Sequence, residues 1–356
     1  MPLIAHNELP AFQQLHEEGQ IVLSSERAEQ QDIRTLHVGL LNMMPDAALI
    51  PTERQFFRLI GASNPIAQFR VHPFALPHQE RGAEAQQHID TYYETFDQIR
   101  AEGLDALIIT GANVTHDNLS EEPFWEPLLE ITNWAHENVT STLCSCLATH
   151  AVLEARHGER RQHLGYKRWG VYPHRVTDKK HPLVSDINTR FNVPHSRYNV
   201  IDRKRFESAG LRVLVEGEIG GVHLAVSGDG IRTVYFQGHP EYDTISLLKE
   251  FKREVIRYQQ GERPDYPPFP DNYFSLTSEA IFEEYKDRLQ AALDNGQPLP
   301  VFPEQLIIPN LDNTWHDSGL AVIGNWMGLV YQITNTERRL PFMSGINPEN
   351  PLNLTK

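Results

Sequence analysis

The sequence predicts an α/β fold in which a mostly parallel sheet carries helices on both faces. In the first half of the chain, short apolar runs of strand length alternate with segments of helical periodicity, and short loops join them. This alternation is typical of parallel strands linked by crossover helices. In the second half, strand-like runs are separated by the glycine-rich turns 220–221 and 228–230, so we expect a mixed arrangement there.

The expected strands are short and mainly apolar, and they cover residues 36–41, 67–74, 104–110, 139–145, 170–176, 211–215, 222–226 and 232–237. The expected helices show apolar residues at helical spacing and cover residues 52–60, 96–102, 124–138, 147–157, 245–259, 277–293 and 321–333. Thr52 is the expected cap of the first of these helices. Residues 261–272 are rich in Pro, Asp and Tyr and are expected to form a surface loop.

The 356 residues favour one large domain with appendages. Residues 1–34 are polar and mixed, and we expect an N-terminal arm there. Residues 35–335 are expected to form a single domain with helices at its C-terminal end. Residues 336–356 contain Pro341, Pro348 and Pro351, so we expect an irregular tail.

The composition narrows the possible partners. A net charge of −15 argues against a nucleic acid or an anionic membrane as the main partner. No run of 18 apolar residues occurs, and the first residues lack the pattern of a signal peptide. The two cysteines, Cys144 and Cys146, are poorly placed to bridge each other, which favours a reducing cytoplasm.

Cys146 stands where an expected strand runs directly into an expected helix. Such a junction lies at the carboxyl edge of a parallel sheet, where ligands bind in open α/β folds. The free N–H groups at the start of the helix, from Leu147 onward, favour a thiolate and can hold an oxyanion. Cys146 is therefore a candidate nucleophile, although a small buried thiol explains its position equally well. We assign Cys144, within the strand, to the core.

His239 follows another expected strand, and Glu241 lies two residues further on. A carboxylate beside an imidazole fixes its tautomer and stabilises its charged form. A lone His-x-Glu pair is more often a turn histidine with a surface glutamate. A cysteine and a histidine at the ends of two strands nevertheless support each other as nucleophile and base.

Several other residues are weaker candidates. Gly111 and Ala112 follow the strand 104–110 and offer a second oxyanion donor or a plain turn. Residues 194–198, PHSRY, either hold a small zwitterion or form a polar loop. Lys167, Arg168 and Arg253 are candidate anion ligands or solvated charges. No histidine or cysteine group has the spacing of a zinc site, so we expect no metal.

The combination resembles the homoserine O-acyltransferase family over residues 36–334. The resemblance rests on the order and spacing of segments 41–45 (LNMMP), 52–56 (TERQF), 109–112 (ITGA), 139–143 (VTSTL), 194–198 (PHSRY), 238–243 (GHPEYD) and 325–326 (NW). It implies the flavodoxin-like fold of the class I glutamine-amidotransferase-like superfamily. It also implies acyl transfer from succinyl-CoA or acetyl-CoA to L-homoserine, which opens methionine synthesis.

The resemblance implies a role for each matching residue. Cys146 would carry the acyl group as a thioester, His239 would accept a proton, and Glu241 would orient the histidine. Lys167, Ser196 and Arg253 fall where the family binds its amino-acid substrate. The resemblance implies no cofactor beyond acyl-CoA as co-substrate. Family members are often dimeric, so a homodimer is one expectation, although the sequence shows no self-complementary patch.

The chain departs from the family at two places. The family usually has two lysines after the Leu-Met-Pro segment, whereas Asp46 and Ala47 stand here. Thr115 occupies the position that tunes acyl choice, where the family has Gly for succinyl or Glu for acetyl. A small neutral residue leaves room for the distal carboxylate without repulsion, which favours succinyl-CoA as donor.

Together these residues predict a ping-pong reaction in which Leu147 and Gly111–Ala112 hold the oxyanion. Acetyl-CoA as donor stays open. Serine as acceptor also stays open, because it differs from homoserine by one methylene, which changes binding by only about 1–3 kcal/mol. A glutamine amidotransferase would usually flank its nucleophile with glycines, and here the flanking residues are Cys144 and Ala148. A binding protein without catalysis is less favoured, because Cys, His and Glu are all present.

Overall fold

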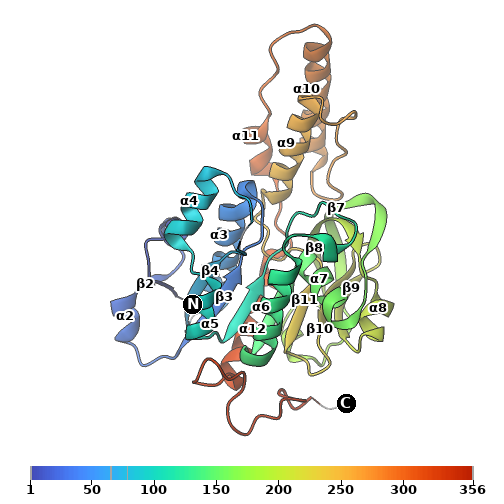
Figure 1. The fold of residues 1–356 in the computed structure, drawn as a ribbon. Helices are drawn as coiled ribbons and strands as arrows, with labels where there is room; N and C mark the ends of the chain where they lie inside the picture. The colour runs from blue at the N-terminus through green and yellow to red at the C-terminus, as the bar shows by residue number, and fades with distance from the viewer. Residues whose placement is uncertain (1, 65, 78, 355–356) are drawn as a thin grey trace.

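The computed structural model describes residues 2–64, 66–77 and 79–354, which form one large sheet with helices on both faces (Figure 1). In the order in which they lie side by side, its strands are β2 (Val22–Ser24), β1 (Leu3–Ala5), β4 (Gln68–Phe74), β3 (Thr35–Leu41), β5 (Ala106–Ile109), β6 (Ser141–Ser145), β11 (Thr233–Phe236), β10 (Gly221–Val226), β9 (Arg212–Gly217), β7 (Gln162–Val176) and β8 (Arg190–Val200).

The sheet is parallel from β2 to β11 and antiparallel from β11 to β8. Within the parallel part, the strands β4-β3-β5-β6-β11 have the order 2-1-3-4-5 when they are numbered along the chain. That order is the flavodoxin-like arrangement. The prediction of a mostly parallel α/β sheet with a mixed second half is therefore confirmed.

The twelve α-helices of the described residues are α1 (Pro10–Glu17), α2 (Ser25–Glu29), α3 (Asp46–Ala62), α4 (Ala83–Tyr92), α5 (Phe96–Glu102), α6 (Trp125–Asn138), α7 (Leu147–His157), α8 (Arg203–Ser208), α9 (Ser246–Gln259), α10 (Leu276–Asp294), α11 (Glu304–Ile307) and α12 (His316–Ile333).

Two apolar layers bury the two faces of the sheet. One layer joins β3, β4 and β6 to Phe56 and Phe57 of α3 and to Trp326 of α12. The other joins the opposite side chains of the same strands to α5, α6 and α7. Neighbouring residues such as Leu143 and Cys144 of β6 belong to different layers, because successive side chains of a strand point to opposite faces.

The N-terminal segment differs from the arm predicted for residues 1–34. Its described residues contribute β1 and β2 to the edge of the sheet, with Leu3 paired to Val22 and to Phe69. Phe12 and Leu15 of α1 are buried in the first apolar layer. The apolar residues of this segment are few, but they occupy the positions that pack on the sheet, so the segment is part of the fold.

Helix α3 begins earlier than the sequence indicated. It starts at Asp46 and continues through Pro51, so Thr52 lies inside the helix and does not cap it. Pro51 is the sixth residue of the helix and cannot donate a backbone hydrogen bond, so the second turn lacks the bond to the Ala47 carbonyl. The helices α5 and α7 have the predicted bounds.

A third apolar cluster lies in the extension formed by α9, α10 and α11, which projects beyond the carboxyl edge of the sheet (Figure 1). Phe251 of α9 packs against Phe282 of α10, with ring centroids 4.9 Å apart. The tail 336–354 is irregular, as predicted, but it packs on the main body: Phe342 is buried, and the Thr140 hydroxyl donates to the Pro341 carbonyl.

Candidate active site

Cys146 occupies a sharp turn between β6 and α7. Its backbone angles are φ 53° and ψ −109°, which correspond to the first central position of a type II′ turn, where glycine is usual. A side chain in this conformation is strained by about 1–3 kcal/mol, and strain of this kind gathers at functional sites. The turn is held because Cys146 N donates to the Phe236 carbonyl at 2.8 Å and the Thr149 hydroxyl donates to the carbonyls of Cys144 and Phe236.

The turn resembles the strand-turn-helix elbow on which some enzymes carry a nucleophile, and the role of Cys146 as nucleophile stays a prediction. Cys146 is partly exposed, whereas Cys144 is fully buried. Burial raises the pKa of Cys144 to about 12, so that thiol stays protonated and inert. The structure therefore separates the two cysteines as the sequence predicted.

Gly111, which follows β5 and Thr110, lies against Cys146. A β-carbon placed on Gly111 would lie 3.7 Å from Cys146 Cβ and 3.9 Å from Leu147 N. Leu147 is the first residue of α7, so its N–H has no acceptor within the helix. Gly111 and Leu147 thus lie beside Cys146 as expected for oxyanion donors, and Ala112 continues the same segment; their roles stay predictions.

His239 reaches the same edge from the neighbouring strand. β11 pairs with β6 so that Phe236 lies opposite Ser145, and His239 follows β11 as Cys146 follows β6. The His239 N–H donates to the Pro194 carbonyl at 2.9 Å, which fixes the turn. Gly238 is required there, because a β-carbon would lie 2.8 Å from His195 Cε1 and closer still to Val193.

Glu241 lies where a triad needs its carboxylate. His239 Nδ1 is 2.8 Å from Glu241 Oε1, and both side chains are buried. His239 Nε2 has no hydrogen-bond partner by distance and angle among the described residues. Burial lowers the pKa of His239, but the negative charges of Glu241 and Cys146 outweigh it and raise that pKa to about 10. The imidazolium is therefore favoured while Cys146 carries a negative charge.

The structure brings Lys167 and Ser196 together on a residue that the sequence did not single out. Lys167 Nζ and Ser196 Oγ both donate to Oε2 of Glu250, at 2.9 and 2.6 Å. The Tyr242 hydroxyl donates to the other oxygen, Oε1, at 2.8 Å. Burial raises the pKa of Glu250, but the three donors outweigh it and lower that pKa, so the carboxylate stays ionised.

Arg253 and Thr115 lie apart from this group. The Arg253 side chain is 58% exposed, and its Nε lies 3.7 Å from Oε1 of Glu254. Thr115 is exposed on the loop after β5, where its N–H donates to Glu122 Oε1 at 2.5 Å. The predicted roles of both residues stay predictions.

Residues 194–198 form part of β8, so the polar-loop alternative is wrong. Beneath the His239 turn, the buried guanidinium of Arg197 donates to His195 Nδ1 at 2.6 Å and to the carbonyls of Gln237 and Gly220. His195 Nε2 faces His174 Nε2 at 3.2 Å. This network supports the strand end that carries His239.

Arg81 places a positive group against residues 44–46, where the family usually has lysines. Arg81 Nη1 donates to the Met44 carbonyl at 2.5 Å and to Asp46 Oδ1 at 3.1 Å, and the Arg81 side chain is buried. Met44 Sδ lies 3.7 Å from the position of a β-carbon on Gly111. Arg81 therefore holds the start of α3 close to the Cys146 site.

Two hollows border the site. One, of about 420 Å³, is lined by Lys167 together with Tyr166, Trp169 and Tyr198. The other, of about 660 Å³, is lined by Glu241 and Tyr242 and by residues of α3 and α12.

Away from Cys146, the ligand atoms of His6, His72 and Glu94 lie within 4.8 Å of one another. His72 is paired on both ring nitrogens, with Glu94 Oε1 at 2.6 Å and His37 Nδ1 at 2.9 Å. These hydrogen bonds account for the His72–Glu94 part of the group without a metal ion. In the part of the chain that the structure describes, no helix is long and apolar enough to cross a bilayer.

The sheet and this site define the class of flavodoxin-like α/β proteins that carry a cysteine, a histidine and a glutamate in triad geometry at the carboxyl edge. A family model described as homoserine O-succinyltransferase matches residues 2–336. The chain belongs to the homoserine O-succinyltransferase family, a family of enzymes, as the resemblance in the sequence implied. The match includes the N-terminal segment, in agreement with its place in the sheet.

Two relatives cover the whole chain. The homoserine O-succinyltransferase of Allochromatium vinosum is 64% identical over 99% of this chain and 99% of its own length. That of Nitrosococcus oceani is 61% identical over 100% of this chain and 99% of its own. Among solved structures, a glutamine amidotransferase from Methylobacillus flagellatus aligns over 83% of this chain and 95% of its own, with 12% identity and a TM-score of 0.43.

Proposed function

We propose that this protein transfers a succinyl group from succinyl-CoA to the hydroxyl of L-homoserine through a thioester on Cys146. The product, O-succinyl-L-homoserine, would enter methionine synthesis in the cytoplasm. Membership of the family supports the overall reaction. The observation that carries the mechanism is the strained Cys146 turn beside the His239–Glu241 pair on the neighbouring strand.

In the first half-reaction, the Cys146 thiolate attacks the thioester carbonyl of the donor, and a carbon–sulfur bond forms. The N–H groups of Leu147 and of the Gly111–Ala112 segment donate hydrogen bonds to the oxyanion, each donor contributing about 3 kcal/mol in comparable sites. When the intermediate collapses, the bond to CoA breaks. The CoA thiolate leaves with the proton of the His239 imidazolium.

Acylation prepares His239 for the second half-reaction. The thioester carries no charge, so one of the two negative groups that raise the pKa of His239 disappears. The neutral imidazole is then favoured, and its Nε2 can take the proton of the homoserine hydroxyl. The alkoxide oxygen attacks the thioester, and the ester product leaves as the Cys146 thiolate returns.

Glu250 supports the binding of an amino acid next to the triad. Its ionised carboxylate suits the α-ammonium group, and Lys167 suits the α-carboxylate. Ser196 Oγ reaches the same carboxylate oxygen. Arg253 lies three residues further along α9 and would add positive charge at the entrance. No cofactor is needed in this scheme, because acyl-CoA is itself a substrate.

The test is product formation with every combination of succinyl-CoA or acetyl-CoA and homoserine or serine, with Cys146→Ala and Cys144→Ala as a matched pair. We expect O-succinylhomoserine, with parallel double-reciprocal plots, from the wild type and from Cys144→Ala, and none from Cys146→Ala. Preference for acetyl-CoA or serine would change the substrates and keep the mechanism. Release of ammonia from glutamine without acyl transfer would refute the proposal.

A further inference from the structure

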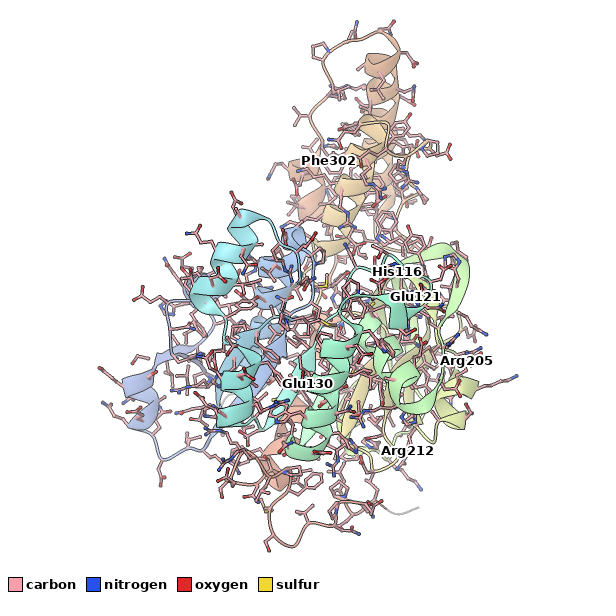
Figure 2. The ribbon with its side chains drawn as sticks, viewed as in Figure 1. His116, Glu121, Glu130, Arg205, Arg212 and Phe302 are labelled. Atoms are coloured by element: carbon pink, nitrogen blue, oxygen red, sulfur yellow. The ribbon has the colours of Figure 1, made fainter. Side chains whose placement is uncertain are left out.

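Arg161 lies just before β7 and extends its side chain to the loop that follows β5. Its Nη2 donates to the carbonyl oxygens of His116 and Asp117, at 3.1 and 3.2 Å. Figure 2 labels His116, which lies on the side of the sheet from which α9 and α10 project. The guanidinium is thereby held in place by neutral carbonyl groups, and the residue is only partly buried.

The remaining N–H groups of Arg161 are available to a ligand. Among the described residues, no carboxylate oxygen lies within 4.0 Å of the guanidinium, and Nε and Nη1 have no protein acceptor. Its neighbour Arg160, in contrast, pairs with Glu154 at 3.3 Å. An anchored arginine with one free edge is suited to bidentate binding of a carboxylate.

The loop itself connects Arg161 to the nucleophile. It begins at Gly111, which lies against Cys146, and it includes Thr115 and His116. Both N–H groups of Thr115 and His116 donate to Glu122 Oε1, at 2.5 and 2.7 Å. The buried Glu122 thus fixes the loop between the thiol and the guanidinium.

The electrostatics agree with this placement. Burial lowers the pKa of Arg161, and the negative charges of Glu154, Glu122, Asp117 and Cys146 oppose the decrease. Cys146 therefore lies within electrostatic reach of Arg161. Arg197 also interacts with Cys146, but its hydrogen bonds to His195, Gln237 and Gly220 leave it committed to the fold.

We propose that Arg161 binds the distal carboxylate of the succinyl group on Cys146 and so selects succinyl over acetyl donors. The inference rests on the proposed acyl transfer at Cys146. A succinyl group extends three carbon–carbon bonds beyond the thioester carbonyl and ends in a carboxylate, whereas an acetyl group ends in a methyl. Only the succinyl group has an anion to offer to the free edge of Arg161.

The test measures the rate of acyl-adduct formation on Cys146 with succinyl-CoA and with acetyl-CoA, in the full-length wild type, Arg161→Gln, Arg161→Lys and the matched control Arg160→Gln. For Arg161→Gln we expect the rate with succinyl-CoA to fall about 10–100-fold, as for loss of a charged hydrogen bond. The rate with acetyl-CoA should change little. Arg161→Lys should keep part of the preference, and Arg160→Gln should keep all of it.

Three results would overturn the inference. Equal losses with both donors would place Arg161 on the CoA moiety or assign it to the loop alone. Unchanged rates in Arg161→Gln would remove it from the donor site. A wild-type protein that forms no adduct with either donor would refute the proposed function as well. Adduct formation with an unchanged donor preference in Arg161→Gln would refute only the role of Arg161.

Discussion

The ring of Tyr242 stacks on the imidazole of His239, with centroids 4.3 Å apart and an angle of 21° between the planes. The hydroxyl of the same tyrosine donates to Glu250. Tyr242 therefore joins the two halves of the site: its ring supports the base, and its hydroxyl reaches the carboxylate that holds Lys167 and Ser196. The His239–Glu241 pair and the Glu250 group therefore form one continuous set of contacts.

Tyr242→Phe separates these two contacts, because it keeps the ring on His239 and removes the donor to Glu250. Burial and the neighbouring carboxylates raise the pKa of Tyr242, so the wild-type hydroxyl is a neutral donor. We expect kcat/KM for homoserine to fall about tenfold, as for the loss of one hydrogen bond to a charged group. The rate of acylation by the donor alone should stay at the wild-type value. A slower acylation step would contradict the assignment of the hydroxyl to the acceptor side.

Glu241→Gln removes the negative charge beside His239 Nδ1 while it keeps the size of the side chain. The pKa of His239 should fall, because burial would then be opposed by one fewer negative group. Turnover should decrease about 10²–10⁴-fold, the range for loss of general acid–base catalysis. Steady-state kinetics with NMR titration of the ring protons checks both effects. An unchanged pKa with wild-type turnover would remove Glu241 from the site.

Cys146→Ala should also lower the pKa of His239 from its value of about 10. In the resting protein, protonated His239 stabilises the folded state. This contribution is complete at a pH below the ordinary histidine pKa of about 6.5, and it is lost as the pH rises through 10. Removal of the thiol should shift that loss to lower pH. The pKa of His239 can be measured by titration in the wild type, in Cys146→Ala and in Cys144→Ala. Only Cys146→Ala should change that pKa.

Gly238→Ala tests the close packing beneath the His239 turn. The added carbon would clash with His195 and Val193, so we expect the free energy of unfolding to fall by about 1–3 kcal/mol. Turnover should be lost because the clash displaces His239. Gly328→Ala is the control. A β-carbon there has no neighbour within 4 Å, and a helical alanine should raise stability by about 0.5–1 kcal/mol. A stable and active Gly238→Ala variant would show that the turn has room.

Local signals in the sequence predicted the elements best. The bounds of α5 were predicted from the helical spacing of residues 96–102, and the structure adds a capping box formed by Thr95 and Gln98. Those of α7 were predicted because Cys146 separates a strand from a helix within one residue. Each of these boundaries depends on residues adjacent in the chain, so no tertiary contact was needed to place them.

Long-range packing decided what the sequence left out. β1 and β2 are strands because they pair with the edge of the sheet, and their three-residue length gives no periodic pattern of its own. β8 carries polar residues whose partners, such as Gln237 for Arg197, lie far along the chain. Glu250 was missed for the same reason, because it looks like a surface residue of α9 until Lys167, Ser196 and Tyr242 meet on it.

The most direct test of the account is the intact mass of the protein after mixing with succinyl-CoA in the absence of an acceptor. The account predicts one added succinyl group on the wild type and on Cys144→Ala, none on Cys146→Ala, and loss of that group when homoserine is added. An adduct that persists on Cys146→Ala, or one that homoserine does not discharge, would contradict it.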